Sequence, residues 1–124
     1  MTPQELEEVI REAIKEVNSR YAPATLDILL TAVLKKKLGN DVGVDVVYEG
    51  SDDFESERIN IPYKISSSVT KLIKSRYTIY IIQGEKTLRY KLICDENVHE
   101  YVQFGHAPRV EHFGVENVEI YPDP

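Results

Sequence analysis

The feature that most constrains this fold is a predicted two-stranded hairpin from Tyr77 to Leu92, with its turn at Gly84-Glu85. Glycine at the first central position of a two-residue turn favours type II′, which pairs Gln83 with Lys86 and sets the register behind them. Hydrophobic alternation predicts the same register independently, because successive side chains of a strand point to opposite faces. One face then collects the apolar side chains Tyr77, Ile79, Ile81, Leu88, Tyr90 and Leu92. The hairpin therefore requires a sheet with one buried face.

The opposite face of the hairpin is predicted to be basic. Its outward set is Arg76, Tyr80, Arg89 and Lys91, with Lys71 and Lys74 shortly before it in the chain. Cations for phosphate beside an aromatic ring for base stacking are typical of a sheet that binds nucleic acid. Two alternatives stay open. Tyr80 and Arg89 form a stabilising cross-strand pair on a solvated face, or the face packs on an acidic segment of the same or a neighbouring chain.

Charge is segregated along the chain, which has a net charge of −6. The stretch from Arg58 to Lys91 contains eight basic residues and one acid, Glu85. From Leu92 to the end there are seven acids and one base, Arg109. A basic middle and an acidic tail are complementary, which favours contact within or between chains. The overall negative charge counts against nucleic acid, because the rest of the molecule would be repelled.

Two helices are predicted before the sheet. Thr2-Pro3-Gln4-Glu5 has the residues of a capping box, and apolar residues recur at helical spacing from there to about Arg20. A second helix follows Pro23 and ends at Gly39. Its apolar residues cover most of its circumference, so we expect it to be buried centrally or covered by a partner.

The segments between the second helix and the hairpin are predicted to form two strands and a short helix. Val42 to Tyr48 alternates as a strand, and an acidic loop is expected from Gly50 to Glu57. A second strand from Arg58 to Ile65 contains Pro62, which predicts an edge strand or a bulge. Ser66-Ser67-Ser68, followed by apolar residues at helical spacing, predicts a short third helix.

The C-terminal part is predicted as short strands. Val98 to Phe104 reads as one strand and the next four residues as a turn, and 110–113 and 118–121 read as a last short pair. Together these patterns predict an α+β fold of two N-terminal helices packed on a mainly antiparallel sheet, with a short third helix inserted. We expect a single domain over residues 1–124.

Motifs for common enzyme chemistries are missing from the sequence. It contains no Walker loop, dinucleotide-binding glycine motif, nucleophile elbow or paired cysteines. His99, His106 and His112 have the right chemistry for a transition metal, but their spacing matches no known ligand pattern, so scattered surface histidines are favoured. Cys94 is the single cysteine and ends an apolar strand, which favours a buried hydrophobic residue over a nucleophile. No cofactor is predicted.

The composition, 42% hydrophobic, suits a globular core and contains no apolar run long enough to span a membrane. The acidic start is unlike a signal peptide, so we expect a cytoplasmic protein; abundant Ile, Lys, Glu, Val and Tyr, with scarce Gln and Met, favour a thermophilic source. The leading hypothesis is a non-enzymatic interaction or assembly protein that forms homo-oligomers or binds another protein. A nucleic-acid-binding protein is the alternative, and a small metal-dependent enzyme that uses the three histidines is a third.

Overall fold

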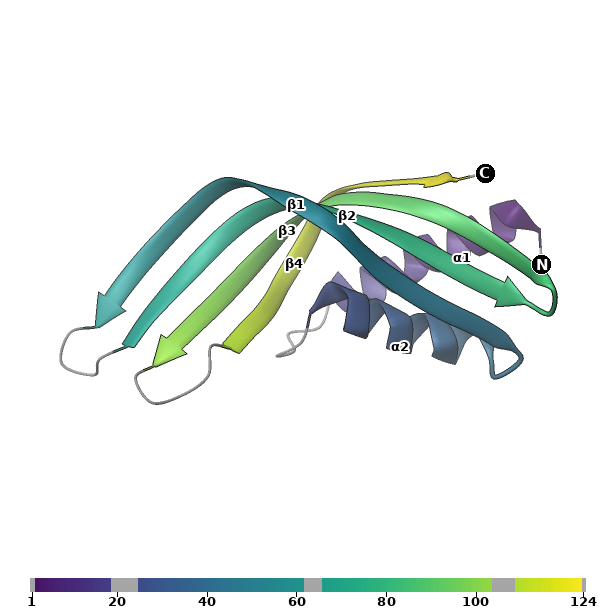
Figure 1. The fold of residues 1–124 in the computed structure, drawn as a ribbon, viewed down its shortest axis with the longest axis horizontal. Helices are drawn as coiled ribbons and strands as arrows, with labels where there is room; N and C mark the ends of the chain where they lie inside the picture. The colour runs from purple at the N-terminus through teal and green to yellow at the C-terminus, as the bar shows by residue number, and fades with distance from the viewer. Residues whose placement is uncertain (1, 19–24, 62–65, 104–108, 124) are drawn as a thin grey trace.

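A four-stranded antiparallel meander follows two helices in this chain (Figure 1). The computed structural model describes residues 2–18, 25–61, 66–103 and 109–123, without the side chains of 53–72 and 98–113. The elements are α1 (Pro3–Asn18), α2 (Leu26–Leu38), β1 (Val42–Ile61), β2 (Ser66–Gln83), β3 (Lys86–Gln103) and β4 (Arg109–Pro122). The strands are hydrogen-bonded in the order β1-β2-β3-β4. The predicted α+β fold with two N-terminal helices on an antiparallel sheet is confirmed.

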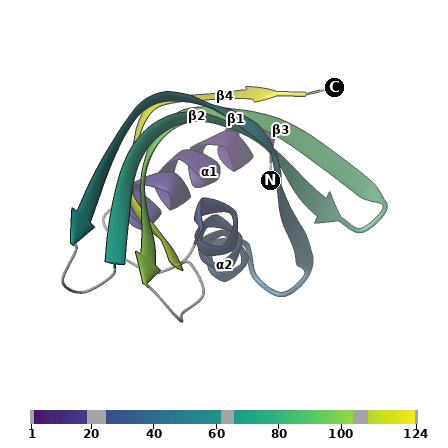
Figure 2. The ribbon, with the colours of Figure 1, turned by 60° about the vertical axis from the view of Figure 1, so that its left-hand side comes forward.

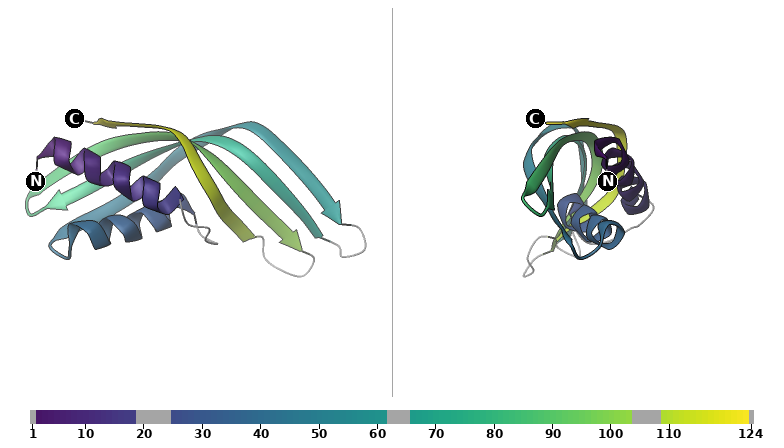
Figure 3. Two further views of the ribbon diagram at one scale, coloured as in Figure 1. Left: turned by 180° about the vertical axis from the view of Figure 1, so that it is seen from behind. Right: turned by 90° about the vertical axis from the view of Figure 1, so that its right-hand side faces the viewer.

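The sheet curls around the two helices, which lie on its concave face (Figure 2). α2 packs against β1 and α1 against β4. Both helices cover one part of the sheet, and the strands extend beyond them at the other end (Figure 3). The core between these layers contains Leu6, Ile10, Ala13, Ile14, Val17, Leu26, Leu30 and Leu34 from the helices and Val44, Val46, Ile79, Ile81, Tyr90 and Leu92 from the sheet. Apolar side chains at a spacing of two in the strands and three or four in the helices meet in this layer.

The predicted hairpin is confirmed in turn and register. Gly84 has a φ of +62°, while Glu85 has a negative φ, as a type II′ turn requires. Gln83 pairs with Lys86, and Tyr80 pairs with Arg89. The hairpin is longer than predicted, because the pairing of β2 with β3 continues to Ser66 and Gln103.

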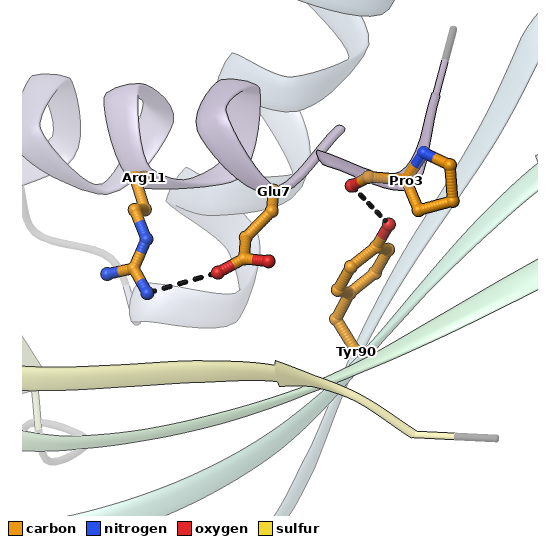
Figure 4. A network of polar contacts seen from close by, with 4 residues as sticks. All are labelled: Pro3, Glu7, Arg11 and Tyr90. Carbon is orange, nitrogen blue, oxygen red and sulfur yellow. Dashed lines mark hydrogen bonds and ion pairs between the residues drawn. The ribbon is translucent and has the colours of Figure 1, made fainter. Parts of the chain in front are cut away.

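Contacts at both ends hold α1 on the sheet. The predicted capping box forms, with Thr2 N donating to Glu5 Oε1 and Glu5 N donating to Thr2 Oγ1, each at 3.2 Å. Beside it, the Tyr90 hydroxyl donates to the carbonyl oxygen of Pro3 at 3.0 Å (Figure 4). At the other end, Val115 N donates to Asn18 Oδ1 at 2.7 Å. A buried strand and the edge strand β4 thus set the position of one helix.

α2 is less covered than its sequence predicts. Leu26, Leu30, Val33 and Leu34 are buried, but Ile28 is 61% exposed, so one apolar side of the helix faces away from the sheet. The helix begins at Leu26, and Gly39 N donates to the carbonyl of Lys35 at its end. Neither helix in the described ranges is long and apolar enough to cross a membrane.

The predicted third helix and acidic loop are wrong. Residues 66–73 belong to β2, and residues 50–57 belong to β1. Glu57 pairs with Thr70 and Gly50 with Arg76, with irregularities in β1 next to Tyr48 and Asp53. The helix was predicted from the spacing of a few apolar residues, and the loop from polar composition. Both are local signals, and pairing on both sides of β2 overrides them.

The predicted C-terminal pair of short strands is also wrong. Both of its members, 110–113 and 118–121, lie on the single strand β4, and the strand predicted from Val98 is the end of β3. The bulge next to Asn117, whose φ is +51°, interrupts the alternation that would have identified one long strand. The predicted turn at 105–108 and Pro62 lie outside the described residues.

Two isoleucines of β2 provide a test of which face is the core. Ile79 has no exposed surface, whereas Ile82 is 41% exposed on the opposite face. Ile79→Ala should lower the free energy of unfolding by about 2–5 kcal/mol, because it leaves a cavity between sheet and helices. Ile82→Ala, the matched control, should cost less than about 1 kcal/mol. Denaturant unfolding followed by circular dichroism measures both, and equal losses would contradict this packing.

Candidate functional site

The outer, convex face of the sheet brings together most of the residues predicted to form a basic site. Tyr80 is half-buried opposite the exposed Arg89, and Lys91 lies opposite Thr78. Arg76 follows on β2, with the exposed Lys74 beyond it. The side chain of Lys71 lies outside the described residues. The register therefore gathers Arg76, Tyr80, Arg89 and Lys91 on one face.

Carboxylates from the flanking strands lie among these cations. Asp45 of β1 pairs with Tyr80, so its side chain lies on the same face. Asp52 accepts a hydrogen bond from Arg76 Nη1 at 3.0 Å. On the other side Glu119 of β4 pairs with Ile93, and within the hairpin itself Asp95 of β3 pairs with Lys74. The described part of this face is a mixed-charge surface, which neutralises much of the positive charge that the hairpin has by itself.

This arrangement gives the outward residues a structural role. The Arg76–Asp52 pair has exposed side chains, and such pairs contribute about 0.2–1 kcal/mol. Asp95 is buried and accepts a hydrogen bond from Asn117 Nδ2 at 2.8 Å, which ties the bulge of β4 to β3. Binding to a nucleic acid stays a prediction, and these carboxylates count against it.

The histidine hypothesis gains no support. The backbones of His99 and His112 lie on adjacent strands, where His99 pairs with Glu111 and His112 with Val98. Their side chains and the whole of His106 lie outside the described residues. Among the side chains that the structure does describe, no three His, Cys, Asp or Glu are grouped closely enough to hold a metal ion. The metal site stays a prediction.

A buried polar pair lies on the inner face where the strands leave the helices. The Tyr77 hydroxyl donates to Glu96 Oε2 at 2.7 Å, and both residues are almost fully buried. Burial, with the negative charge of Glu96, raises the pKa of Tyr77 above its usual range. The Tyr77 ring also packs against the Tyr48 ring, with centroids 5.6 Å apart. The arrangement holds a proton firmly and has no accessible reacting atom.

Small residues separate the two members of this pair along the sheet. Ser75 and Cys94 form the intervening cross-strand pair and are fully buried. The Ser75 hydroxyl makes no hydrogen bond with the part of the chain that is described. Sequence reasoning missed Glu96, because the apolar pattern stops at Cys94. Continuing the hairpin register by two residues would have placed this carboxylate on the inner face.

A third feature is the open groove between α2 and β1. We call its helical wall, formed by Asp27, Ile28, Thr31, Ala32 and Lys35, the groove face of α2. Asp45 and Val46 of β1 line the other side. β1 is an edge strand that pairs with β2 alone in the described residues. The groove therefore places a partly apolar helix surface beside unpaired backbone groups.

Comparison with protein-family models, curated proteins and solved structures finds no match to this chain.

Burial of Cys94 gives a test of the inner face. Its side chain is 1% exposed, and burial raises the pKa of its thiol to about 12. Because the thiolate is the reactive form, a disulfide reagent such as DTNB at pH 8 should label the native protein at least about a hundredfold more slowly than the unfolded protein. Absorbance of the released thiolate measures both rates. Equally fast labelling in the two states would show that this face is open.

The buried side chains of Cys94 and Tyr77 should make the folded protein less stable at alkaline pH. The pKa of Cys94 is raised from its ordinary value of 9.0, and the pKa of Tyr77 is raised from 10.0. Above pH 9 the unfolded thiol loses its proton while the folded thiol keeps it, so the free energy of unfolding should drop by up to about 1.4 kcal/mol per pH unit and group. Guanidinium unfolding between pH 7.5 and 10.5 measures this. Cys94→Ala should flatten the drop between pH 9 and 10, and an unchanged slope would contradict the assignment.

Proposed function

We propose that this protein is a non-enzymatic assembly protein that associates with itself. The observation that carries the proposal is the uncovered edge formed by α2 and β1. Ile28 is 61% exposed and Tyr48 49% exposed, both on these two elements. Scattered exposed apolar residues are ordinary, but here they flank a strand with unpaired backbone groups.

The two edges of the sheet differ in a way that supports this proposal. From Val42 to Tyr48, β1 pairs with β2 without irregularity. This segment is rich in valine and carries one charged residue, Asp45. The described part of β4 carries Glu116 and Glu119, a bulge and Pro122. Charges, bulges and proline are the usual protection of an edge strand against pairing. Where it lies beside α2, β1 has the single charge of Asp45 and neither a bulge nor a proline.

The chemistry of the described side chains also supports a non-enzymatic role. The buried polar groups of Tyr77 and Glu96 bond to each other and do not line the α2–β1 groove. The basic residues of the outer face lie among carboxylates. An apolar edge with few charges suits a protein surface better than a phosphate or a reacting substrate.

Self-association predicts a mass that depends on protein concentration. Size-exclusion chromatography with light scattering, from about 1 to 500 µM, should show a dimer or larger species at the upper end. The exposed apolar side chains provide the driving force, so 0.5 M NaCl should not abolish it. A monomeric mass throughout this range, in low and high salt, would contradict the proposed function.

A further inference from the structure

The charges on the groove face of α2 match those of a second copy of the same face. Asp27 and Lys35 lie at opposite ends of the groove face of α2. They are eight residues apart, or about 12 Å along the helix, which is too far to pair with each other. Between them lie Ile28, Thr31 and Ala32. This surface thus has an acidic end, a mainly apolar middle and a basic end.

We infer that two chains form a dimer in which the groove faces of α2 pack antiparallel about a two-fold axis; this rests on the proposed assembly function. An axis near Thr31 places Asp27 of each copy opposite Lys35 of the other. In a two-fold contact each interaction occurs twice, so both charged ends are satisfied together. A parallel arrangement would set Asp27 against Asp27 and Lys35 against Lys35, so charge selects the antiparallel one.

The middle of the groove face is suited to close approach. The Thr31 hydroxyl donates to the carbonyl oxygen of Asp27 at 2.6 Å, so it needs no partner and leaves its methyl group for packing. Ala32 is small and exposed, which lets two helices come near. Ile28, 61% exposed in one chain, becomes covered in the pair. The dimer thus removes from water the most exposed large apolar side chain among the described residues.

The edge of β1 fits the same axis. A two-fold axis perpendicular to α2 and β1 makes each antiparallel to its copy. Neighbouring strands lie about 4.8 Å apart, and packed helices about 8–10 Å. Because α2 packs against β1, bringing the two Val42–Tyr48 segments side by side also brings the two α2 helices together. One axis therefore pairs the unprotected strand edges and the complementary helix faces.

A charge exchange tests this interface. Asp27→Lys and Lys35→Asp should each raise the dissociation constant at least about tenfold, because each creates two repulsive contacts. The double variant restores opposite charges across the axis and should return to within about threefold of the wild type. Sedimentation equilibrium measures the three constants. Glu12→Lys, on the exposed side of α1, changes the charge by the same amount as Asp27→Lys; it is the control for that variant and should leave association unchanged.

The double variant separates pairing from damage to the helix. It puts a cation at the start and an anion at the end of α2, against the helix dipole, so a purely structural effect would make it the weakest of the three. Circular dichroism confirms that each variant is folded. A wild-type dimer that none of the variants weakens would overturn this interface and leave the assembly function standing, whereas a monomeric wild type would overturn the assembly function itself.

Hydrogen exchange tests the strand part of the interface separately. In the wild-type dimer, the backbone amides of Val42–Tyr48 that point away from β2 should be protected from exchange. Asp27→Lys, measured at a concentration where it is monomeric, should lose this protection. Amides of β4 at 114–121 form the matched control, since the other edge of the sheet should exchange equally in both proteins. Equal exchange of Val42–Tyr48 in the dimer and the monomer would overturn the pairing of the β1 edges.

Discussion

The register of β2 against β3 is the constraint on which the rest of this structure depends. It is set at the Gly84-Glu85 turn and holds over the full length of both strands. A slip of β3 by one residue against β2 would move Tyr90 and Leu92 from the core to the outer face and bring Arg89 inward. The helices would then lose the part of the apolar inner face that β3 contributes. A single tight turn therefore determines both the core and the identity of the outward residues.

Elements with strong local signals were predictable from the sequence, and elements fixed by distant partners were not. The turn at Gly84 and the Thr2–Glu5 capping box are each determined by the residue types within four consecutive positions. The hairpin and the start of α1 were therefore correctly predicted. Residues 50–57 form a strand because they pair with residues 70–76 of β2, and residues 66–73 form one because they pair with both β1 and β3. Their polar and serine-rich composition carries no local trace of that pairing, so a loop and a helix were the natural predictions.

The same division applies to the candidate sites. Membership of the outer face followed from alternation in the hairpin, so Arg76, Tyr80, Arg89 and Lys91 were assigned to one face correctly. Three of the carboxylates beside them, Asp45, Asp52 and Glu119, come from β1 and β4, whose alignment depends on bulges that the sequence pattern does not reveal. The buried Glu96 was missed for a related reason, since an acid at an inward position contradicts the apolar alternation used to find the strand.

An acidic protein that binds itself must overcome its own repulsion. Each chain has a net charge of −6, so two copies repel at long range, and only a contact with local attraction can offset this. The described outer face carries charges of both signs and no continuous exposed apolar patch, and the β4 edge adds further acids. The groove beside α2 combines an exposed apolar residue, an open strand edge and charges of both signs, Asp27 and Asp45 against Lys35. Repulsion at the acidic β4 edge would then favour association through the groove.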